Sequence, residues 1–558
     1  MSQFDEQVDF VVAGSGGGSL CAALVMAAAG KRVVVLEKTE FVGGTTARSG
    51  GVMWIPNNPF LARDGIEDSL EKARRYLDSL VADESDAPGS TPARRDRYLR
   101  EAPAMVDYLT QQGIQLDRVS YWPDYYDERP GALEQGRCLV AAPFNINQLG
   151  PWRERMRPGF LEMPATLEEA LVIPYFKRWS KARKTLFKVV ARTIWSRLTG
   201  KRYVSAGKAL QGRMLLAALE AGADIRTSSP VKELMVEGDK IVGVVTEQNG
   251  QPWRIAAAQG VLVGAGGFSH NQAMRDRYQP GTSTRWSSAL PSDTGEMIVE
   301  MQRCGAAIAQ MEEMVGNQCV LSPDSQEGEI QFGAQGITAK PHAILVDQSG
   351  RRYMNEGGSY MAYCKNMLRH HAETPAVPSW AIMDSQFLAK YMLAGTMPGK
   401  KKPDHWFESG FLKKAESIGD LAAMIDIDPD TLRASVERFN GFVDANHDAD
   451  FGRGARAYDR WLGDPLQQPN PALGKIEQGP FYAVAVYPGD VSTYGGVVTD
   501  DKARVLRGDG SVIEGLYACG VSTASMMGRC YPGAGASVGP SLTWGYIAAQ
   551  EALGAAPQ

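Results

Sequence analysis

The first forty residues constrain the fold more than any other part of the chain. Residues 9–14, DFVVAG, form a short apolar run typical of a buried strand, and the glycine turn GSGGGS begins at Gly14. A helix-like run then reaches Gly30, and a second apolar strand, RVVVLEK, leads to Glu37. Strand, glycine turn, helix and strand, with an acidic residue about 20 positions after the turn, predict a dinucleotide-binding fold.

Residues of this unit have roles that follow from geometry. Gly14 allows the tight turn, and Gly16 lets a pyrophosphate approach the helix N-terminus. Glu37 is expected to accept hydrogen bonds from the adenosine ribose. Ser19 stands where a third glycine is common, and its small side chain still allows helix and strand to pack closely.

Composition limits the remaining classes of function. A chain of 558 residues predicts two or more domains, and a net charge of -5 makes nucleic acid an unexpected partner. The seven cysteines form no CxxC pair and the six histidines no HExxH motif, so no catalytic metal is expected and a reducing compartment is favoured. The beginning, MSQFDEQVDF, carries acids where a signal peptide has basic residues, so we expect a cytoplasmic protein.

A second glycine and hydroxyl cluster identifies the kind of dinucleotide. FVGGTTARSGG, residues 41–51, comes too soon after the first turn for a simple NAD domain. It resembles the segment by which flavoproteins of the fumarate reductase and ketosteroid dehydrogenase superfamily pass the pyrophosphate and flavin. GVLVGAGGFSHN, residues 260–271, and GLYACG, residues 515–520, also resemble strand ends of those flavoproteins. The resemblance implies FAD as the cofactor.

The expected FAD contacts come from segments far apart in the chain. They converge only if the fold brings both ends of the chain together. The predicted cofactor-binding residues are Gly14, Ser15, Gly16, Gly17, Gly18, Glu37, Lys38, Gly44, Thr45, Thr46, Ser49, Gly50, Gly51, Val231, Ala265, Gly266, Gly520, Ser537, Val538 and Leu542.

This distribution predicts an α/β protein with a discontinuous FAD-binding domain. Residues 1–273 and 491–558 would form the Rossmann-like domain. Residues 274–490 would form an inserted α+β substrate and catalytic domain that closes over the flavin, since ligand sites favour domain interfaces.

Residues 174–202 form a basic segment with ten basic residues and no acid. On a helix, one face would be apolar, with Phe187, Val190, Ile194 and Leu198. Another face would gather Lys177, Lys181, Lys184, Lys188 and Arg192, with Trp179 and Trp195 as interfacial anchors. This pattern predicts peripheral contact with the inner face of the cell membrane. A solvated helix covering the core, or contact with an acidic protein partner, remains an alternative.

Several further motifs sharpen the resemblance. GRCYPGAGASVG, residues 528–539, follows GGVVTD and GLYACG, and together they look like the end of the bacterial 3-ketosteroid Δ1-dehydrogenases. FVGGTTARSGGVMWIP looks like their N-terminal signature, and PDYY at 123–126 and GRRYMNEGGSY at 350–360 also match. The resemblance covers nearly the whole chain and is weakest across about 140–205.

The resemblance implies a reaction and its residues. Members of this family desaturate the first ring of a 3-ketosteroid between carbons 1 and 2, while FAD takes hydride from carbon 1. Residue matching assigns Tyr531 and the Gly535 amide to the ketone oxygen, where charge develops. It assigns Tyr360 as the base that takes the carbon 2 proton, with Tyr125 assisting. A free phenol has a pKa near about 10, so Tyr360 must be helped by its neighbours.

Two other functions remain open at this point. A 3-ketosteroid Δ4-(5α)-dehydrogenase would keep the flavin and a tyrosine base, although the intact YPGAG favours Δ1 chemistry. A non-catalytic flavin or steroid binding protein would not need all four matched residues. The expected partners are a 3-ketosteroid and a quinone or other electron acceptor, while the steroid side chain at carbon 17 and the oligomeric state are left undetermined.

Overall fold

The computed structural model describes residues 4–81, 87–248 and 250–554. Residues 1–3 and 555–558, at the two ends of the predicted FAD-binding domain, lie outside the described residues. Within these residues the largest sheet has ten strands, with β1 (Glu6–Val8), β12 (Gln251–Ala257) and β11 (Lys240–Gln248) at one end of its main path. Its parallel strands follow in the spatial order β25 (Val512–Ala518), β13 (Val261–Val263), β2 (Phe10–Ala13), β3 (Val33–Leu36) and β9 (Asp224–Arg226).

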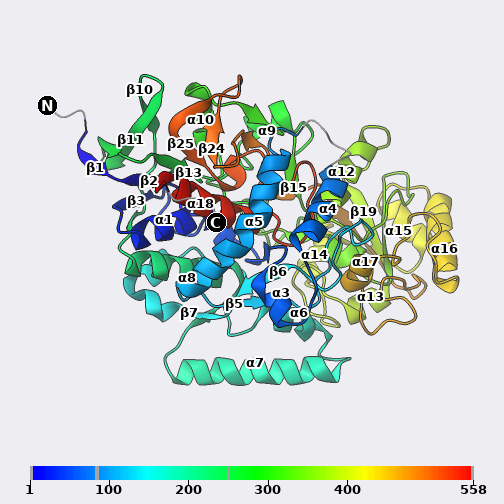
Figure 1. The fold of residues 1–558 in the computed structure, drawn as a ribbon. Coiled ribbons are helices and arrows are strands. Elements are labelled where there is room, and N and C mark those ends of the chain that lie inside the picture. Colours follow the sequence, from blue (N-terminus) through cyan, green and yellow to red (C-terminus); the bar gives the residue numbers. More distant parts are fainter. Residues whose placement is uncertain (1–3, 82–86, 249, 555–558) are drawn as a thin grey trace.

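This order brings both ends of the chain into one layer. β25, from the C-terminal part, pairs with β13, which pairs in turn with β2 near the N-terminus. The four residues of β2 and of β3 are all buried, as expected for parallel strands covered on both faces. On one face α1 (Gly17–Ala28) packs between α18 (Val538–Ala552) and α8 (Ala206–Glu220) (Figure 1). The predicted α/β class is confirmed.

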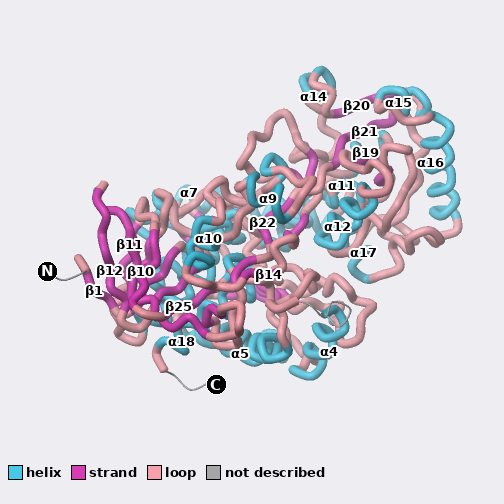
Figure 2. The backbone as a smooth tube through the Cα atoms, turned by 90° about the horizontal axis from the view of Figure 1, so that it is seen from above, coloured by secondary structure: helices cyan, strands magenta, loops and turns pink. Residues whose placement is uncertain are grey.

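A second, antiparallel sheet lies in the other lobe of the molecule (Figure 2). Its order is β18 (Ala343–Val346), β19 (Ser379–Met383), β21 (Phe481–Val486) and β20 (Leu412–Ala415). One apolar cluster on this sheet includes residues of α12 (Tyr360–His371), and another includes residues of α16 (Pro429–Asp444). Tyr360 is the first residue of α12, so its position depends on this second lobe.

The basic segment forms the helix α7 (Ser180–Leu198), preceded by the short 3-10 helix η2 (Ile173–Tyr175). Figure 1 places α7 along the lower edge of the molecule, apart from the main body. Its buried residues are Ala182, Val189 and Ser196, which recur every seven positions and therefore share one face. The predicted apolar residues lie on the opposite face and are exposed, including Phe187 at 73% and Leu198 at 76%.

Ion pairs connect the basic segment to neighbouring parts of the chain. Arg178 pairs with Asp464 at 2.7 Å, and Arg192 bonds Glu169 of α6 (Leu167–Val172). Arg192 is therefore tied to a carboxylate, whereas Lys181 and Lys184 are exposed beside the apolar face. None of the described helices is long and apolar enough to cross a membrane.

Candidate active site

The glycine turn between β2 and α1 has the geometry that a phosphate site requires. Gly14 has a φ of +96°, and a Cβ there would lie 2.5 Å from the Gly264 carbonyl oxygen, so only glycine fits. Gly16 is the N-cap of α1, no side chain caps this helix, and its first turn carries no acid. The positive end of the helix dipole therefore faces the cavity above the turn.

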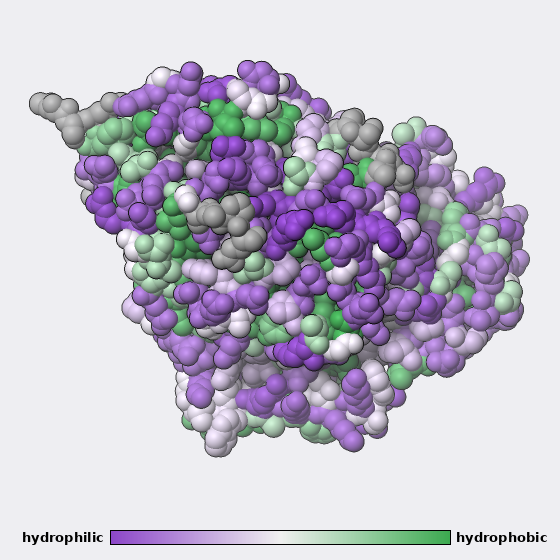
Figure 3. Space-filling model, in the orientation of Figure 1, coloured by the Kyte–Doolittle hydropathy of each residue, from purple (hydrophilic) through white to green (hydrophobic). Residues whose placement is uncertain are grey.

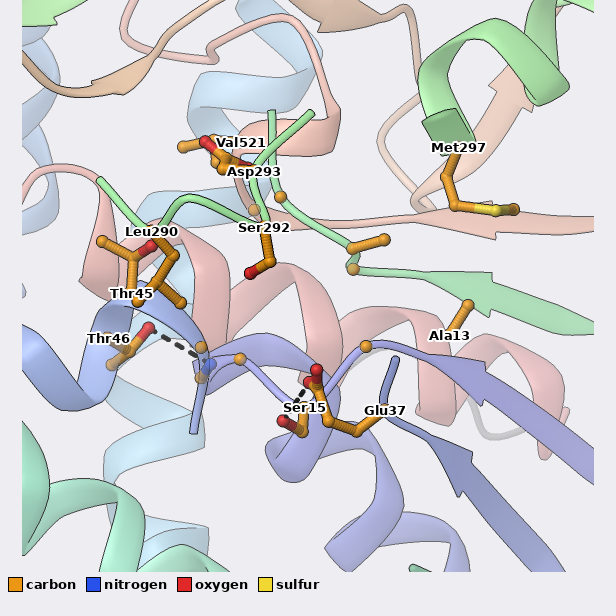
Figure 4. A pocket seen from close by; sticks show the side chains of 18 of the residues that line it. Ala13, Ser15, Glu37, Thr45, Thr46, Leu290, Ser292, Asp293, Met297 and Val521 are labelled. Carbon is orange, nitrogen blue, oxygen red and sulfur yellow. Dashed lines mark hydrogen bonds between the residues drawn. The ribbon is translucent and has the colours of Figure 1, made fainter. Parts of the chain in front are cut away.

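Glu37 is held at the end of β3 by a small hydrogen-bond network (Figure 4). The Ser15 hydroxyl donates to Glu37 Oε2 at 2.6 Å, and the Gly43 amide donates to the same serine at 3.0 Å. Thr39 donates to Glu37 Oε1 through its amide and its hydroxyl. Glu37 is a carboxylate fixed at the cavity wall, in the place expected for a ribose acceptor.

A cavity of about 400 Å³ extends from this turn toward the start of α18. Most of the predicted cofactor contacts line it. They are Gly14, Ser15, Gly16, Gly17, Glu37, Lys38, Gly44, Thr45, Thr46, Ser49, Val231, Ala265, Gly266, Gly520, Ser537 and Val538. This elongated cavity is thus lined by strand ends, glycine turns and hydroxyls from both ends of the chain. Such a lining fits a dinucleotide.

Four predicted contacts lie outside this cavity wall: Gly18, Gly50, Gly51 and Leu542. Gly18 packs against α18, where its amide donates to the Ser541 hydroxyl, and Leu542 is fully buried in the core. Gly51 has a φ of +63°, and a Cβ there would lie 2.6 Å from the Gly207 nitrogen. The structure therefore gives these residues packing contacts next to the cavity.

Other residues also line the cavity, although no sequence motif predicted them. Leu290, Ser292, Asp293, Glu296 and Met297 come from a segment expected in the substrate domain (Figure 4). Glu296 pairs with Lys38 at 2.5 Å, so the lysine is neutralised at the cavity rim. Burial raises the pKa of Asp293 to about 6.

Three of the four predicted catalytic residues are phenols that the fold brings together. Tyr360 from α12 packs on Tyr531 with ring centroids 5.1 Å apart, and on Tyr125 at 5.4 Å. The Tyr531 hydroxyl lies 3.0 Å from the hydroxyl of Ser537, which lines the large cavity. The phenols are therefore next to the end of the cavity formed by the start of α18.

Gly535 has the conformation and the free donor that its predicted role requires. Its φ is +86°, and a Cβ would lie 2.1 Å from the Val52 carbonyl oxygen. Its carbonyl accepts from the Trp54 and Gly539 amides. Within the described residues its own N–H donates to no acceptor, although Gly535 is buried. A buried N–H without a partner is rare, so a ligand oxygen is a natural acceptor.

Sequence reasoning missed a fourth phenol, Tyr458. It stands in α17 (Ala457–Leu462), and its ring lies 4.4 Å from that of Tyr125 between centroids. Trp461 stacks on its other side at 5.6 Å. No motif or spacing marked this residue among the twenty tyrosines, because its contact with Tyr125 joins segments more than three hundred residues apart.

The four phenols form a continuous series of ring contacts in the order Tyr458, Tyr125, Tyr360 and Tyr531. Burial raises the pKa of Tyr360 well above its usual value, while the hydrogen bond from Tyr125 acts in the opposite direction. Burial likewise raises the pKa of Tyr531 and of Tyr125. Tyr125 has one hydroxyl proton and two phenolic neighbours, so it donates to Tyr458 or to Tyr360 at one time.

Comparisons with known proteins agree with this site. The family of FAD binding domains matches residues 9–538. A 3-oxosteroid 1-dehydrogenase of Mycolicibacterium smegmatis is 37% identical and aligns over 98% of this chain and 97% of its own length. The crystal structure of 3-ketosteroid delta1-dehydrogenase from Sterolibacterium denitrificans, in complex with 1,4-androstadiene-3,17-dione, has a TM-score of 0.92 at 33% identity, covering 98% of this chain and 100% of that one.

A more distant structure shares only the fold. The 3-ketosteroid-delta4-(5alpha)-dehydrogenase of Rhodococcus jostii has a TM-score of 0.66 at 20% identity, over 99% of this chain and 98% of that one. The fold, the cavity and the family match define an FAD-dependent oxidoreductase. Within that class, the chain belongs to the 3-oxosteroid 1-dehydrogenase family.

Proposed function

We propose that this enzyme desaturates the first ring of 3-ketosteroids between carbons 1 and 2. The observation that carries the proposal is the packing of Tyr360 against Tyr531, beside the unpaired Gly535 amide and next to the FAD cavity. In this proposal two donors, Tyr531 and the Gly535 amide, and one base, Tyr360, act on the first ring of the same steroid. A carbon next to a ketone becomes acidic only when donors stabilise the oxygen on which charge develops.

The residues that line the large cavity would hold FAD. Gly14, Gly16 and Gly17 would approach the pyrophosphate at the start of α1, and Glu37 would accept from the ribose. FAD supplies a two-electron acceptor for the hydride of carbon 1. We propose that the lobe carrying α12 closes a steroid against the cavity end near Ser537.

Tyr531 and Gly535 would polarise the ketone. Either hydroxyl of the Tyr531 and Ser537 pair can donate, so Tyr531 would give its single proton to the ketone oxygen while accepting from Ser537. The Gly535 N–H would supply the second donor. Burial raises the pKa of Tyr531, which keeps this hydroxyl protonated and able to donate at neutral pH.

Tyr360 would take the carbon 2 proton, supported by two phenols. As Tyr360 becomes negatively charged, the Tyr125 hydroxyl would donate a hydrogen bond to it, and the Tyr458 hydroxyl would turn to donate a hydrogen bond to Tyr125. Because burial raises the pKa of Tyr360, the active deprotonated form should increase as the pH rises. Removal of either supporting hydroxyl should move this rise to higher pH.

Anaerobic mixing with androst-4-ene-3,17-dione tests the reaction. This steroid already carries the bond that a Δ4 enzyme forms, so bleaching of the flavin indicates Δ1 chemistry. Loss of two hydrogens in the product, measured by mass, should accompany the bleaching. If the flavin is bleached only by 5α-androstane-3,17-dione, the Δ4 function is favoured; if neither steroid bleaches it, the enzyme does not act on these substrates.

A matched pair of variants tests the base. Tyr360→Phe should keep the flavin and steroid binding but lose about 10²-fold or more in the rate of flavin reduction. Tyr363→Phe is the control, because Tyr363 is buried on the same helix and bonds Thr338 outside the phenol series. Equal rates in Tyr360→Phe and the wild type would remove Tyr360 as the base.

We also propose that the enzyme binds the cytoplasmic face of the membrane through α7 and passes electrons to a quinone. The outward face of α7 carries Phe187, Ile194, Trp195 and Leu198, each more than half exposed. Lys181 and Lys184 nearby are exposed and form no ion pair with any described residue. In Figure 3 green patches occur among purple ones along the lower edge, where Figure 1 places α7. An apolar stripe flanked by lysines and a tryptophan fits the interface of an anionic bilayer.

Co-sedimentation with vesicles tests this contact. Wild type should sediment with vesicles containing phosphatidylglycerol, and the double variant Phe187→Ser and Leu198→Ser should stay in the supernatant. Val299→Ser is the control, since Val299 is 53% exposed on α10 (Glu296–Arg303), remote in sequence from α7. Wild type that remains in solution, or an equal loss in the control, would contradict membrane binding. Binding to an acidic protein and to no vesicle would favour the protein partner.

A further inference from the structure

A second, smaller cavity lies behind the wall of the FAD cavity. Its volume is about 20 Å³, and Arg94 and Trp544 form one side of it. Gly520, Val521, Ser537 and Ser541 line both cavities. A single layer of residues therefore separates Arg94 from the space assigned to FAD, at the end where α18 begins.

Arg94 is an unusual buried cation. It is 1% exposed, and its Nη1 donates to the carbonyls of Gly89 and Ala524. Its guanidinium carbon lies 4.6 Å from the centre of the Trp544 ring, a cation–π contact. Burial lowers the pKa of Arg94 to about 10, which still leaves it charged at neutral pH.

The other fully buried arginines differ from Arg94 in one respect. Arg137 and Arg275 bond aspartates, and Arg453 lies 3.4 Å from Glu356. Within the described chain no salt bridge joins Arg94 to a carboxylate, and its Nε has no hydrogen-bond partner. An unpaired buried charge costs several kcal/mol. A neutral side chain would avoid this cost, so the buried positive charge of Arg94 indicates a negatively charged group that it stabilises.

We propose that Arg94 directs positive potential through the shared wall toward the flavin and thereby favours flavin reduction. The inference rests on FAD binding in the large cavity. When a hydride passes to the flavin, the ring system gains negative charge, and a nearby cation stabilises it. The interior screens charges far less than water does, so the field acts across one layer of residues. No side chain caps the start of α18, and the positive end of its dipole contributes potential of the same sign.

The cavity also has room for about one water molecule. Trp544 Nε1 and Arg94 Nε are both buried and unpartnered in the described chain. Such a water would accept from both groups and hold the guanidinium in place. Arg94 acts on the flavin through its electric field and does not touch the substrate. Its removal should therefore change the reduction potential of the flavin.

The midpoint potential of the bound flavin tests the proposal. Arg94→Gln removes the charge and leaves a neutral polar side chain, whereas Arg94→Lys keeps the charge. Arg100→Gln is the control, because Arg100 is exposed on the same helix, α5 (Pro92–Gln111). We expect Arg94→Gln to lower the equilibrium constant for flavin reduction about tenfold, or about 30 mV for two electrons. Arg94→Lys should recover most of this loss, and Arg100→Gln should leave the potential unchanged.

Three outcomes would overturn the proposal. A potential for Arg94→Gln equal to that of wild type would exclude the field effect. Equal losses in the Gln and Lys variants would make shape, and not charge, the cause. If Arg94→Gln does not fold, Ser525→Asp gives the same test, because it places a carboxylate in the small cavity beside Arg94. This variant should also lower the potential, and an unchanged value would refute the role of the charge.

Discussion

Substitution of Gly535 by alanine tests the ketone site most directly. The substitution adds one methyl group to a residue with a φ of +86°. That methyl carbon would lie 2.1 Å from the Val52 oxygen and 2.4 Å from the Val52 carbonyl carbon, whereas ordinary contact begins at 3.4 Å. Both obstacles are backbone atoms next to β4 (Met53–Trp54), so no side chain rotation relieves the clash.

The expected loss follows from this geometry. The loop at Gly535 must move by more than about 1 Å, and a misplacement of that size costs about 10²-fold in rate. Loss of one oxyanion donor costs a similar factor, about 10²–10³-fold. We therefore expect the rate of flavin reduction by androst-4-ene-3,17-dione to fall about 10²-fold or more, equal to roughly 3 kcal/mol or more in the barrier. Strain in the left-handed region should also lower the stability by about 1–2 kcal/mol.

Anaerobic stopped-flow mixing, followed through the flavin absorbance, measures this rate. The visible spectrum of the resting variant must first confirm that FAD is bound. Gly441→Ala is the matched control, because Gly441 lies inside α16 with no atom within 4 Å of its added methyl group. The control should keep its rate and gain up to about 1 kcal/mol in stability. A Gly535→Ala rate within threefold of wild type, with FAD bound, would refute the assignment of this amide.

Three other predictions follow from the same structure. Tyr458→Phe should move the rise of kcat with pH upward, since the variant no longer supports Tyr125; an unchanged kcat profile would limit Tyr458 to packing. Glu37→Ala should weaken FAD binding about tenfold or more, measured by release of flavin fluorescence on dilution, and retention equal to wild type would exclude the ribose contact. Because burial raises the pKa of Asp293 to about 6, the folded protein binds this proton more tightly than the unfolded chain, so wild type should lose stability relative to Asp293→Asn as the pH rises from about 4 to 6. Urea unfolding of both proteins should show a difference that changes by about 2 kcal/mol over this range, and a constant difference would contradict the buried carboxyl.

Local patterns explain how much of the cofactor site was predictable. Gly14 had to be a glycine because the turn between a parallel strand and its helix needs positive φ and close approach, and the structure has both there. Gly16 has a φ of -68° and room for a Cβ, so only the expected approach of the pyrophosphate accounts for its glycine. Gly535 was predictable for the same reason as Gly14 within its short motif. Gly18 and Leu542 stay predicted contacts: in the structure Gly18 bonds Ser541 of α18 and Leu542 is buried in the core.

Contacts between distant segments were not predictable from the sequence. Residues 290–297 lead into α10, and only the folded chain brings them to the FAD cavity. Tyr458 meets Tyr125 across hundreds of residues. Tyr360 was expected to be helped toward its anion, but the resting structure raises its pKa by burial, an effect that depends on every surrounding segment.

By itself, the sequence determined the fold class, the dinucleotide turn and the family of the enzyme, because these depend on short-range geometry and on motifs that stay contiguous in the chain. Only the tertiary structure decided which phenols touch, which amide is free and which arginine is left without a carboxylate. These properties depend on packing and on the exclusion of water, and both exist only when the two lobes and both ends of the chain have come together.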